Sequence, residues 1–147
     1  DIQYYLAGCG EKEKKLQKYI NDNGLMYNVH LLGFREDISR LLTAADFFVF
    51  PSFREGLSVA LMEAMASRLP VVCSEIRGNV DLIDGEKGGI LFNPKSQYEL
   101  RKALRTAISL SDSEREKMGL YNSEKVKIFN TDIVEEKMEE LYSEIIE

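Results

Sequence analysis

Short apolar runs alternate with longer helical stretches along most of the chain. Five runs rich in aromatic and β-branched residues predict strands, and polar or Gly-containing breaks separate each of them from the next element. The expected strands are Asp1–Leu6, Val29–Leu32, Phe47–Phe50, Val71–Ser74 and Ile90–Phe92. Strands that alternate with helices indicate a parallel sheet with helices on its faces. The pattern therefore predicts an α/β fold with a doubly wound parallel sheet and a helical C-terminal tail.

Longer stretches, most of them without Gly or Pro and several with an apolar face, predict the helices. They are expected at Glu11–Asn21, Asp37–Ala44, Leu57–Ser67, Val80–Ile83, Tyr98–Leu110, from Ser113 to about Lys127, and from Thr131 onward. Ser113 and Glu116 have the spacing of a capping box. The inward faces are expected to contain Leu16, Tyr19 and Ile20 in the first helix, Leu100, Ala103, Leu104, Ala107 and Ile108 in the fifth, and Ile133, Met138, Leu141, Tyr142 and Ile145 in the last.

The candidate chemistry lies between Phe47 and Ser74, in a strand–loop–helix–strand unit. Its loop comes after the carboxyl end of a strand, where open α/β sheets bind their ligands. Gly56 allows a ligand to approach the backbone closely. The N–H groups of Gly56, Leu57 and Ser58 stand at a helix N-terminus, which attracts anions. This loop is therefore predicted to bind a phosphate-bearing ligand.

This unit contains two carboxylates, Glu55 and Glu63, with seven residues between them. Eight steps along a helix span roughly 12 Å, at about 1.5 Å a residue. That separation exceeds the roughly 5–9.5 Å of a glycosidase carboxylate pair. It suits an extended ligand with hydroxyls at both ends and a diphosphate between them. Because Val59, Ala60 and Ser67 are apolar or small, Glu63 is expected to point into a partly enclosed site.

Composition sets broad limits on the function. The 147 residues, 44% hydrophobic and 30% charged, fit one soluble globular domain. A net charge of −6 argues against nucleic acid as a partner. No apolar run approaches the roughly 20 residues of a transmembrane helix. Cys9 and Cys73 are isolated from each other and from His30, which predicts reduced thiols rather than a metal site. Gly8-Cys9-Gly10 is interpreted as a strand-to-helix turn rather than a phosphate loop.

The segment PSFREGLSVALMEAMASRLPVV resembles the Glu-x7-Glu signature of the retaining, group-one nucleotide-sugar glycosyltransferases of GT-B fold. The resemblance continues through LLGFREDISRLLTAAD and CSEIRGNVDLIDGEKGGILFNP and covers most of residues 1–94. The last of these segments is most similar to members from bacterial capsule and exopolysaccharide synthesis. The resemblance implies a Rossmann-like domain that forms half of a GT-B fold.

By the same resemblance, Glu55 is the catalytic position that meets the hydroxyls of the transferred sugar, and Glu63 binds the ribose. Gly56, Leu57 and Ser58 meet the diphosphate, and Phe34 and Arg35 lie against the nucleotide base, although Phe34 also suits a core position. The family needs no metal or other cofactor. Ser58 and Arg68 depart from its pattern, which often has Gly in place of Ser58 and usually has Gly in place of Arg68. Arg68 predicts that its turn is not left-handed.

The implied function is the donor-binding half of an enzyme that transfers a sugar from a nucleotide diphosphate sugar to a sugar or lipid-linked acceptor. Its expected setting is bacterial surface polysaccharide synthesis in the cytoplasm, with a membrane-peripheral location left open. The chain is expected to lack a first strand and an N-terminal acceptor domain, and to be inactive alone. A gap or a borrowed strand is expected between Gln3–Leu6 and Phe47–Phe50, rather than direct pairing.

Two other functions stay open. A non-catalytic nucleotide-binding or regulatory module would tolerate the loss of Glu55, because only sugar recognition needs that residue. A sugar-nucleotide epimerase of the same fold would release an altered sugar nucleotide without any acceptor. The nucleotide base, the sugar, the acceptor and the oligomeric state are not indicated by the sequence.

Overall fold

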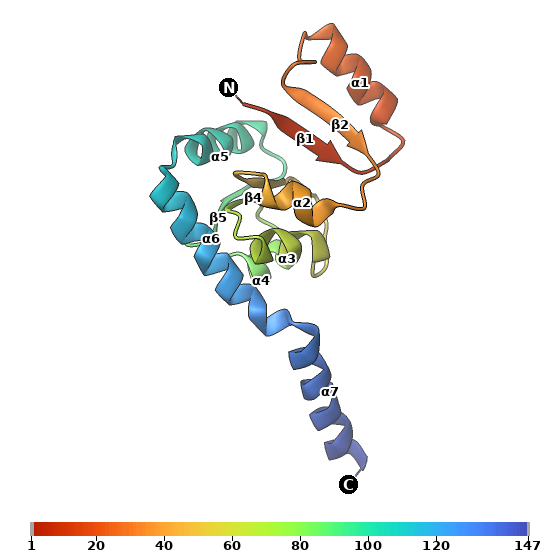
Figure 1. Ribbon diagram of the computed structural model, residues 1–147, viewed down its shortest axis with the longest axis vertical. Coiled ribbons are helices and arrows are strands. Elements are labelled where there is room, and N and C mark those ends of the chain that lie inside the picture. Colours follow the sequence, from red (N-terminus) through yellow and green to blue (C-terminus); the bar gives the residue numbers. More distant parts are fainter. Residues whose placement is uncertain (1, 147) are drawn as a thin grey trace. The chain divides into compact units, whose positions relative to one another are not determined.

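Five strands and their connecting helices make up the described residues, and the strands pair in parallel within two sheets (Figure 1). The computed structural model describes residues 2–146, and the side chains of residues 2–143. The strands are β1 (Tyr4–Ala7), β2 (Val29–Gly33), β3 (Phe48–Phe50), β4 (Val71–Ser74) and β5 (Gly89–Phe92). The helices are α1 (Glu13–Asp22), α2 (Ile38–Thr43), α3 (Val59–Ala66), α4 (Arg77–Leu82), α5 (Gln97–Ser109), α6 (Asp112–Val126), the 3-10 helix η1 (Lys127–Phe129) and α7 (Thr131–Ile146). This order confirms the α/β fold predicted from the sequence.

The chain divides into two compact units, Asp1–Leu41 and Leu42–Glu147. In the first unit β1 and β2 pair in parallel, from Tyr4 opposite Val29 to Ala7 opposite Gly33. Ile20 of α1 is buried as expected, but Leu16 and Tyr19 are 42% and 61% exposed. The expectation for these two side chains was wrong, because a sheet of two strands covers little of a helix.

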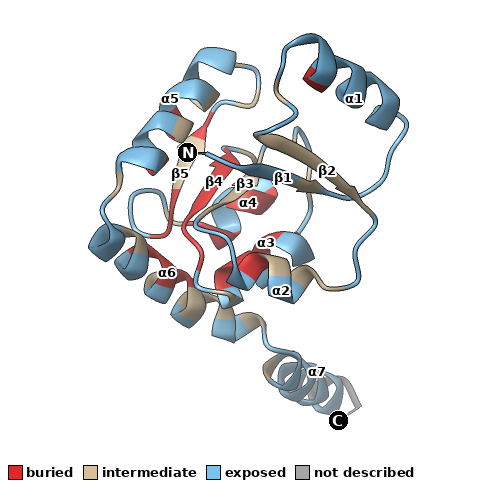
Figure 2. Ribbon diagram, turned by 45° about the horizontal axis from the view of Figure 1, so that its top comes forward, coloured by how far each residue is buried: buried red, intermediate tan, exposed pale blue. Residues whose placement is uncertain are grey.

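The second unit holds a three-stranded sheet in the order β3-β4-β5. Its central strand β4 is buried along its whole length (red in Figure 2). Val71 and Cys73 of β4 pack into one cluster with side chains of α3 and α4, whereas Val72 packs into a second cluster with Ala103 and Ala107 of α5. Because successive strand residues point to opposite faces, helices cover both faces of this sheet. This is the doubly wound arrangement that the sequence predicted.

Each unit has its own sheet among the described residues: β1 pairs with β2 in the first unit, and β3 pairs with β4 in the second. The expectation of a gap or a borrowed strand between Gln3–Leu6 and Phe47–Phe50, rather than direct pairing, stays a prediction.

Two helix starts differ from the sequence-based expectation. The helix expected from Val80 begins at Arg77 instead, so Gly78 lies in the first helical turn. The capping box of α6 is formed by Ser111 and Glu114, not by Ser113 and Glu116. Ser111 has extended backbone angles and exchanges hydrogen bonds with Glu114, at 2.8 Å to its carboxylate and 3.3 Å from its N–H. Ser113 already lies inside the helix, where it cannot act as a cap.

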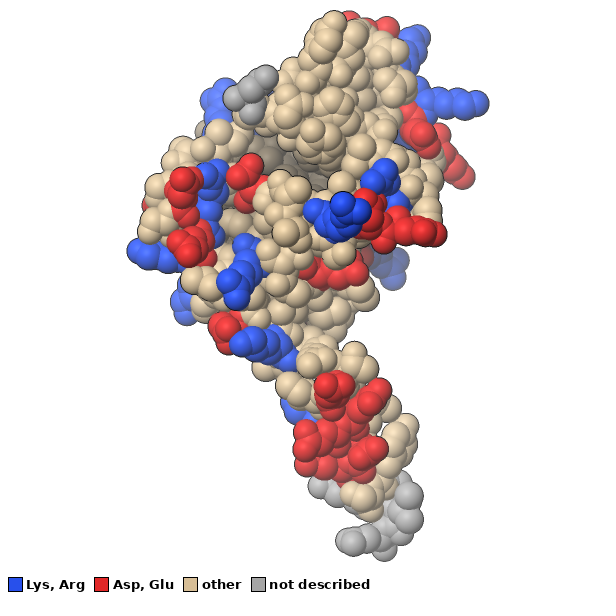
Figure 3. Space-filling model, in the orientation of Figure 1, with Lys and Arg blue, Asp and Glu red and all other residues tan. Residues whose placement is uncertain are grey.

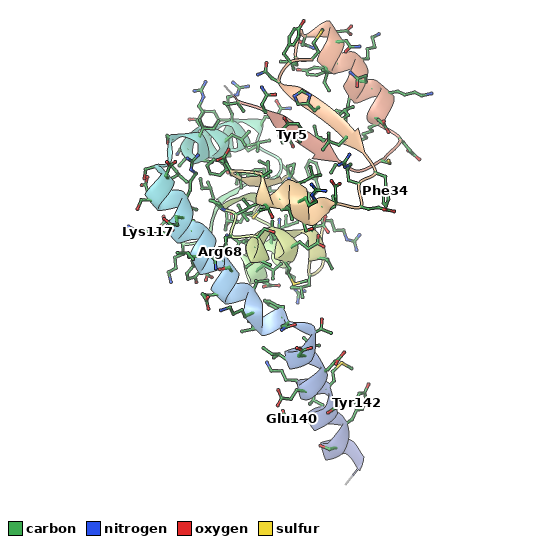
Figure 4. The ribbon with its side chains drawn as sticks, in the orientation of Figure 1. Tyr5, Phe34, Arg68, Lys117, Glu140 and Tyr142 are labelled. Carbon is green, nitrogen blue, oxygen red and sulfur yellow. The ribbon has the colours of Figure 1, made fainter. Side chains whose placement is uncertain are left out.

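Two predicted helix faces are only partly buried. In α5, Ala103 and Ala107 are buried, but Ile108 is 51% exposed, contrary to expectation. In α7, Met138, Leu141 and Tyr142 are exposed, although all three were expected to point inward. Figure 3 shows acidic side chains gathered on α7, and Figure 4 labels Glu140 and Tyr142 there. Ile133 is half-buried, and the side chain of Ile145 lies outside the described residues. An apolar helical stripe is buried only where another element covers it, and α7 packs mainly on the short η1.

The turn between α3 and β4 overturns the expectation for Arg68 (labelled in Figure 4). This residue has φ +60°, in the left-handed region. Its N–H donates to the Met65 carbonyl at 3.0 Å, and the next N–H, of Leu69, donates to the Ala64 carbonyl at 3.1 Å. These two bonds form a Schellman motif, which requires a left-handed residue at this position. Arg68 is left-handed because this conformation lets the N–H groups of Arg68 and Leu69 bond to the last carbonyls of α3.

Candidate functional site

The candidate loop connects β3 to α3 at the carboxyl end of its strand. Ser58 is the N-cap of α3, with extended backbone angles, and its hydroxyl accepts a 3.4 Å hydrogen bond from the N–H of Leu61. Ser58 itself is buried, Glu55 is half-buried, and Gly56 and Leu57 are exposed. The helix therefore starts two residues later than the sequence suggested, and the loop before it is correspondingly longer.

Three consecutive backbone amides stand free at this helix start. Among the described residues, the N–H groups of Gly56, Leu57 and Ser58 have no hydrogen-bond partner. Such amides carry partial positive charge, and the dipole of the adjoining helix adds to it. The loop thus offers hydrogen-bond donors of the kind that bind phosphate oxygens.

Glu63 lies on an exposed part of α3. The buried face of this helix consists of Leu61, Ala64 and Met65, and Glu63 falls outside it. Its expected neighbour Val59 is 64% exposed, so the partly enclosed site predicted for this carboxylate is not formed in this structure. A side chain so exposed is available to a ligand that arrives from solvent.

The loop also changes the expected spacing between the two carboxylates. Only the path from Val59 to Glu63 is helical, which is four of the eight steps from Glu55. Helical rise therefore accounts for about 6 Å of the path, and the rest is loop backbone. The spacing of roughly 12 Å assumed a continuous helix, and the structure does not have one.

One neighbour of the loop was missed from the sequence. Gly78, in the first turn of α4, is buried directly against the backbone of Glu55 and Gly56. The sequence did not indicate that Gly78 contacts the loop, because a glycine between two strands is usually assigned to a turn. The contact becomes visible only in the tertiary structure.

Phe34 and Arg35 belong to the unit of residues 1–41. Phe34 lies just after β2 and is 74% exposed, so it is not the core side chain that was the alternative (Figure 4). Arg35 forms a bidentate pair with Asp37, from Nε to Oδ1 at 2.8 Å and from Nη2 to Oδ2 at 2.7 Å. The Arg35 hydrogen bond is the main cause of the lowered pKa of Asp37. Arg35 is therefore held in one orientation by its own turn.

The two cysteines differ in accessibility. Cys9 is exposed in the turn after β1, and Cys73 is buried in β4, where desolvation raises the pKa of its thiol to about 12. A hollow of about 260 Å³ at the end of β1 is lined by the Gly8–Gly10 turn, by the charged side chains Lys12 and Glu13, and by apolar side chains that include Leu6, Leu16 and Leu31.

The described residues lack two further kinds of feature. No group of three or more His, Cys, Asp or Glu side chains among them could hold a metal ion. None of the helices described is long and apolar enough to cross a membrane.

The chain is similar to proteins of known class. The family model "Glycosyl transferases group 1" matches residues 1–125. The chain is 32% identical over 102 residues to the lipopolysaccharide glucosyltransferase WaaG of Escherichia coli K12, covering 69% of the chain and 27% of WaaG. It is 37% identical over 121 residues to the amylovoran biosynthesis glycosyltransferase AmsK of Erwinia amylovora, covering 77% of the chain and 30% of AmsK.

A solved structure gives the same classification. HepE of Anabaena, in complex with UDP, matches with a TM-score of 0.81 and 26% identity, over 97% of the chain and 41% of HepE. HepE has also been solved with UDP-glucose. The chain spans less than a third of WaaG or AmsK. Its α/β architecture of parallel strands is that of the GT-B glycosyltransferases it matches. With a family match over residues 1–125, the chain belongs to the group 1 glycosyltransferases.

Proposed function

We propose that this chain is the donor-binding half of a retaining glycosyltransferase. The full-length enzyme would transfer a sugar from a nucleotide diphosphate sugar to a sugar or lipid-linked acceptor, in bacterial surface polysaccharide synthesis on the cytoplasmic side. The acceptor would be bound by an N-terminal domain, which together with a first strand would complete the enzyme. The relatives WaaG and AmsK, of lipopolysaccharide and amylovoran synthesis, support this assignment.

The observation that carries the proposal is the stretch from Glu55 to Glu63. It places three free amides, those of Gly56, Leu57 and Ser58, between two carboxylates at the start of a helix. Amides suit a diphosphate, and carboxylates suit hydroxyl groups. We assign the diphosphate to the amides, the transferred sugar to Glu55 and the ribose to Glu63. Phe34 and Arg35 are assigned to the base by the family resemblance alone.

This assignment accounts for the chemistry without a nucleophile from this chain. The amides and the helix dipole stabilise the negative charge that develops on the leaving diphosphate, an electrostatic contribution. The leaving phosphate itself then accepts the proton of the attacking acceptor hydroxyl. Glu55 holds the sugar while the bond at its anomeric carbon is exchanged.

Calorimetric titration of the full-length protein with UDP and UDP-glucose, the ligands of HepE, tests the roles of the two carboxylates. We expect Glu63→Ala to weaken the binding of both ligands about 10- to 100-fold, because a hydrogen bond to a charged group contributes roughly 1.5–3 kcal/mol. Glu55→Ala is expected to weaken the binding of UDP-glucose only, since bare UDP carries no sugar.

Glu116→Ala is the matched control, because it removes an exposed glutamate from α6. Equal effects of Glu55→Ala and Glu63→Ala on bare UDP would contradict the assigned roles. An unchanged affinity of Glu55→Ala for both ligands would instead favour a nucleotide-binding module. Release of an altered sugar nucleotide in the absence of acceptor would favour an epimerase.

A further inference from the structure

The backbone of the candidate loop rests on Gly78 of α4. A methyl group on this glycine would overlap the carbonyl oxygen of Gly56 and lie 2.8 Å from its carbonyl carbon. The same methyl group would lie 3.0 Å from the carbonyl oxygen of Glu55. Because backbone atoms cannot swing aside as a side chain can, any larger residue at position 78 must displace this part of the loop.

Little else fixes the loop at this point. Within the described residues, the backbone from Phe53 to Leu57 makes no hydrogen bond to another part of the chain. Glu55 is nevertheless half-buried, so packing rather than hydrogen bonding determines where its backbone lies. The contact with Gly78 is therefore a direct determinant of the position of Glu55.

The first turn of α4, on which the loop packs, is held in place by buried contacts. Asn79, the residue after Gly78, is fully buried and donates its amide to the carbonyl of Ser74 at the end of β4, at 2.9 Å. Leu82 and Ile83 at the other end of α4 are buried in the core cluster with Leu61. The first turn of α4 is therefore bonded to the end of β4 on one side and packs against the loop on the other.

Other tightly packed glycines serve different contacts. Gly119 of α6 lies against the backbone of Arg68, with a would-be methyl group 2.7 Å from its carbonyl carbon. Gly89 of β5 lies against Val71, with a would-be methyl group 2.7 Å from its carbonyl oxygen. Gly78 is distinguished from them because its contact is the loop that carries Glu55.

We propose that Gly78 is a positioning residue for Glu55: its missing side chain sets the position from which this carboxylate reaches the sugar of the donor. The inference rests on the proposed function, in which Glu55 binds the transferred sugar. A displacement of a catalytic group by about 1 Å can lower the reaction rate as much as 100-fold. A methyl group at position 78 is therefore sufficient to move Glu55 out of hydrogen-bonding reach of the sugar.

The test compares the affinities of the full-length protein for UDP-glucose and for UDP. We expect Gly78→Ala to lower the ratio of the UDP-glucose affinity to the UDP affinity at least tenfold, toward the ratio of Glu55→Ala. The affinity for UDP itself should also fall, because the Gly56 carbonyl shares a peptide unit with the Leu57 amide that is assigned to the diphosphate. The double variant Gly78→Ala/Glu55→Ala should have the ratio of Glu55→Ala alone, because residues that act through one another are not additive. Gly119→Ala is the matched control, since it introduces a similar overlap away from the loop and should lower the melting temperature while keeping the ratio.

The outcomes separate this inference from the proposed function. If Glu55→Ala leaves the ratio unchanged, the role of Glu55 is wrong and the proposed function fails. If Glu55→Ala lowers the ratio but Gly78→Ala does not, or if the double variant is additive, Gly78 does not act through Glu55 and the inference is overturned. Should Gly78→Ala not fold, Asn79→Ala loosens the same turn by removing its bond to Ser74. A ratio unchanged in that variant would equally overturn the inference.

Discussion

Ser58 caps α3 with its hydroxyl, and its own backbone N–H has no partner among the described residues. The two groups of one residue therefore have separable roles, the hydroxyl in helix stability and the amide in anion binding. We expect Ser58→Gly to bind UDP within about threefold of the wild type, since this change at an N-cap costs a few tenths of a kcal/mol. Ser58→Pro should bind at least about tenfold more weakly, because proline has no N–H.

Proline is a fair probe here, because the φ of Ser58 is −83°, near the value that the proline ring imposes. Ser58→Ala completes the set: it loses the cap, at about 1 kcal/mol of stability, but keeps the amide. Titration calorimetry and thermal melts of the three variants separate the two roles. A loss of UDP binding in Ser58→Ala as large as in Ser58→Pro would show that the hydroxyl is the ligand.

Arg68 holds a left-handed conformation that costs a non-glycine residue roughly 1–2 kcal/mol. Glycine adopts this conformation without that cost, although it loses more backbone entropy on folding. We therefore expect Arg68→Gly to stabilise the chain by about 1 kcal/mol and to raise its melting temperature by about 3 °C. Ser67→Gly is the control, because Ser67 has φ −78° and should be destabilised by glycine. A fall in the melting temperature of Arg68→Gly would mean that the arginine side chain stabilises the turn.

At the scale of elements, α6 is fastened to the sheet by polar contacts. Asn122 is fully buried and donates its amide to the carbonyls of Leu69 and Gly88, at 2.8 and 2.7 Å. One side chain thus joins the turn before β4 to the entry of β5. Asp84, in the loop between α4 and β5, accepts a hydrogen bond from the Tyr121 hydroxyl and pairs with Lys125 at 3.0 Å. These contacts make the α4–β5 loop part of the same unit as α6.

The Asp84 contacts predict a dependence of stability on acid. The hydrogen bond from Tyr121, followed by that from Lys125, lowers the pKa of Asp84 in the folded chain. A carboxylate whose pKa is lower in the folded state stabilises the fold above its unfolded pKa of about 3.9 and loses this effect as the pH falls through the folded value. We expect the melting temperature of Asp84→Asn to lie below that of the wild type at pH 6.

The gap between the two melting temperatures should begin to narrow as the pH falls below about 4, and should close only below the lowered folded-state pKa of Asp84, where both side chains are neutral. Asp22→Asn, which changes an exposed aspartate at the end of α1, is the control for the general effect of charge. Thermal melts from pH 7 to pH 3 provide the comparison. A gap that stays constant over this range would show that the charge of Asp84 contributes nothing to stability.

At the scale of the whole molecule, stability is distributed unequally between the two units. Both clusters of the core lie in residues 42–147, around β4. Among the described residues of the first unit, Ile20 is the one buried side chain. Because local opening is easiest where few apolar contacts are broken, we expect the amides of β1 and β2 to exchange with solvent much faster than those of β4.

Hydrogen exchange measured by mass spectrometry reports this difference directly. Peptides from residues 71–74 should be the most protected, and peptides from residues 4–7 and 29–33 should lose protection at least about 100-fold sooner. Val71→Ala is expected to reduce the protection of the second unit alone. Equal protection of both sheets would contradict the assignment of stability to the β4 core.

Local patterning was sufficient to predict the elements of this fold. The alternation of short apolar runs and helical stretches indicates the five strands and places β4 without error, because its four residues are apolar or small between clear breaks. It also indicates the loop at residues 55–58, since turn residues and a helix start are encoded by adjacent positions.

Contacts between distant parts of the chain decided the rest. Gly78 and Glu55 are far apart in the sequence, and no local pattern relates a glycine in α4 to the backbone of a remote loop. The left-handed turn at Arg68 was decided by the carbonyls at the end of α3, against the preference of the residue itself. Glu63 and the apolar side chains Met138, Leu141 and Tyr142 of α7 are exposed because no other element of the described chain packs over them. The sequence by itself determined which segments become strands and helices, because hydrogen bonding and periodicity are local. Tertiary structure decided which side chains those segments bury and which backbone atoms meet, because packing depends on residues far apart in the chain.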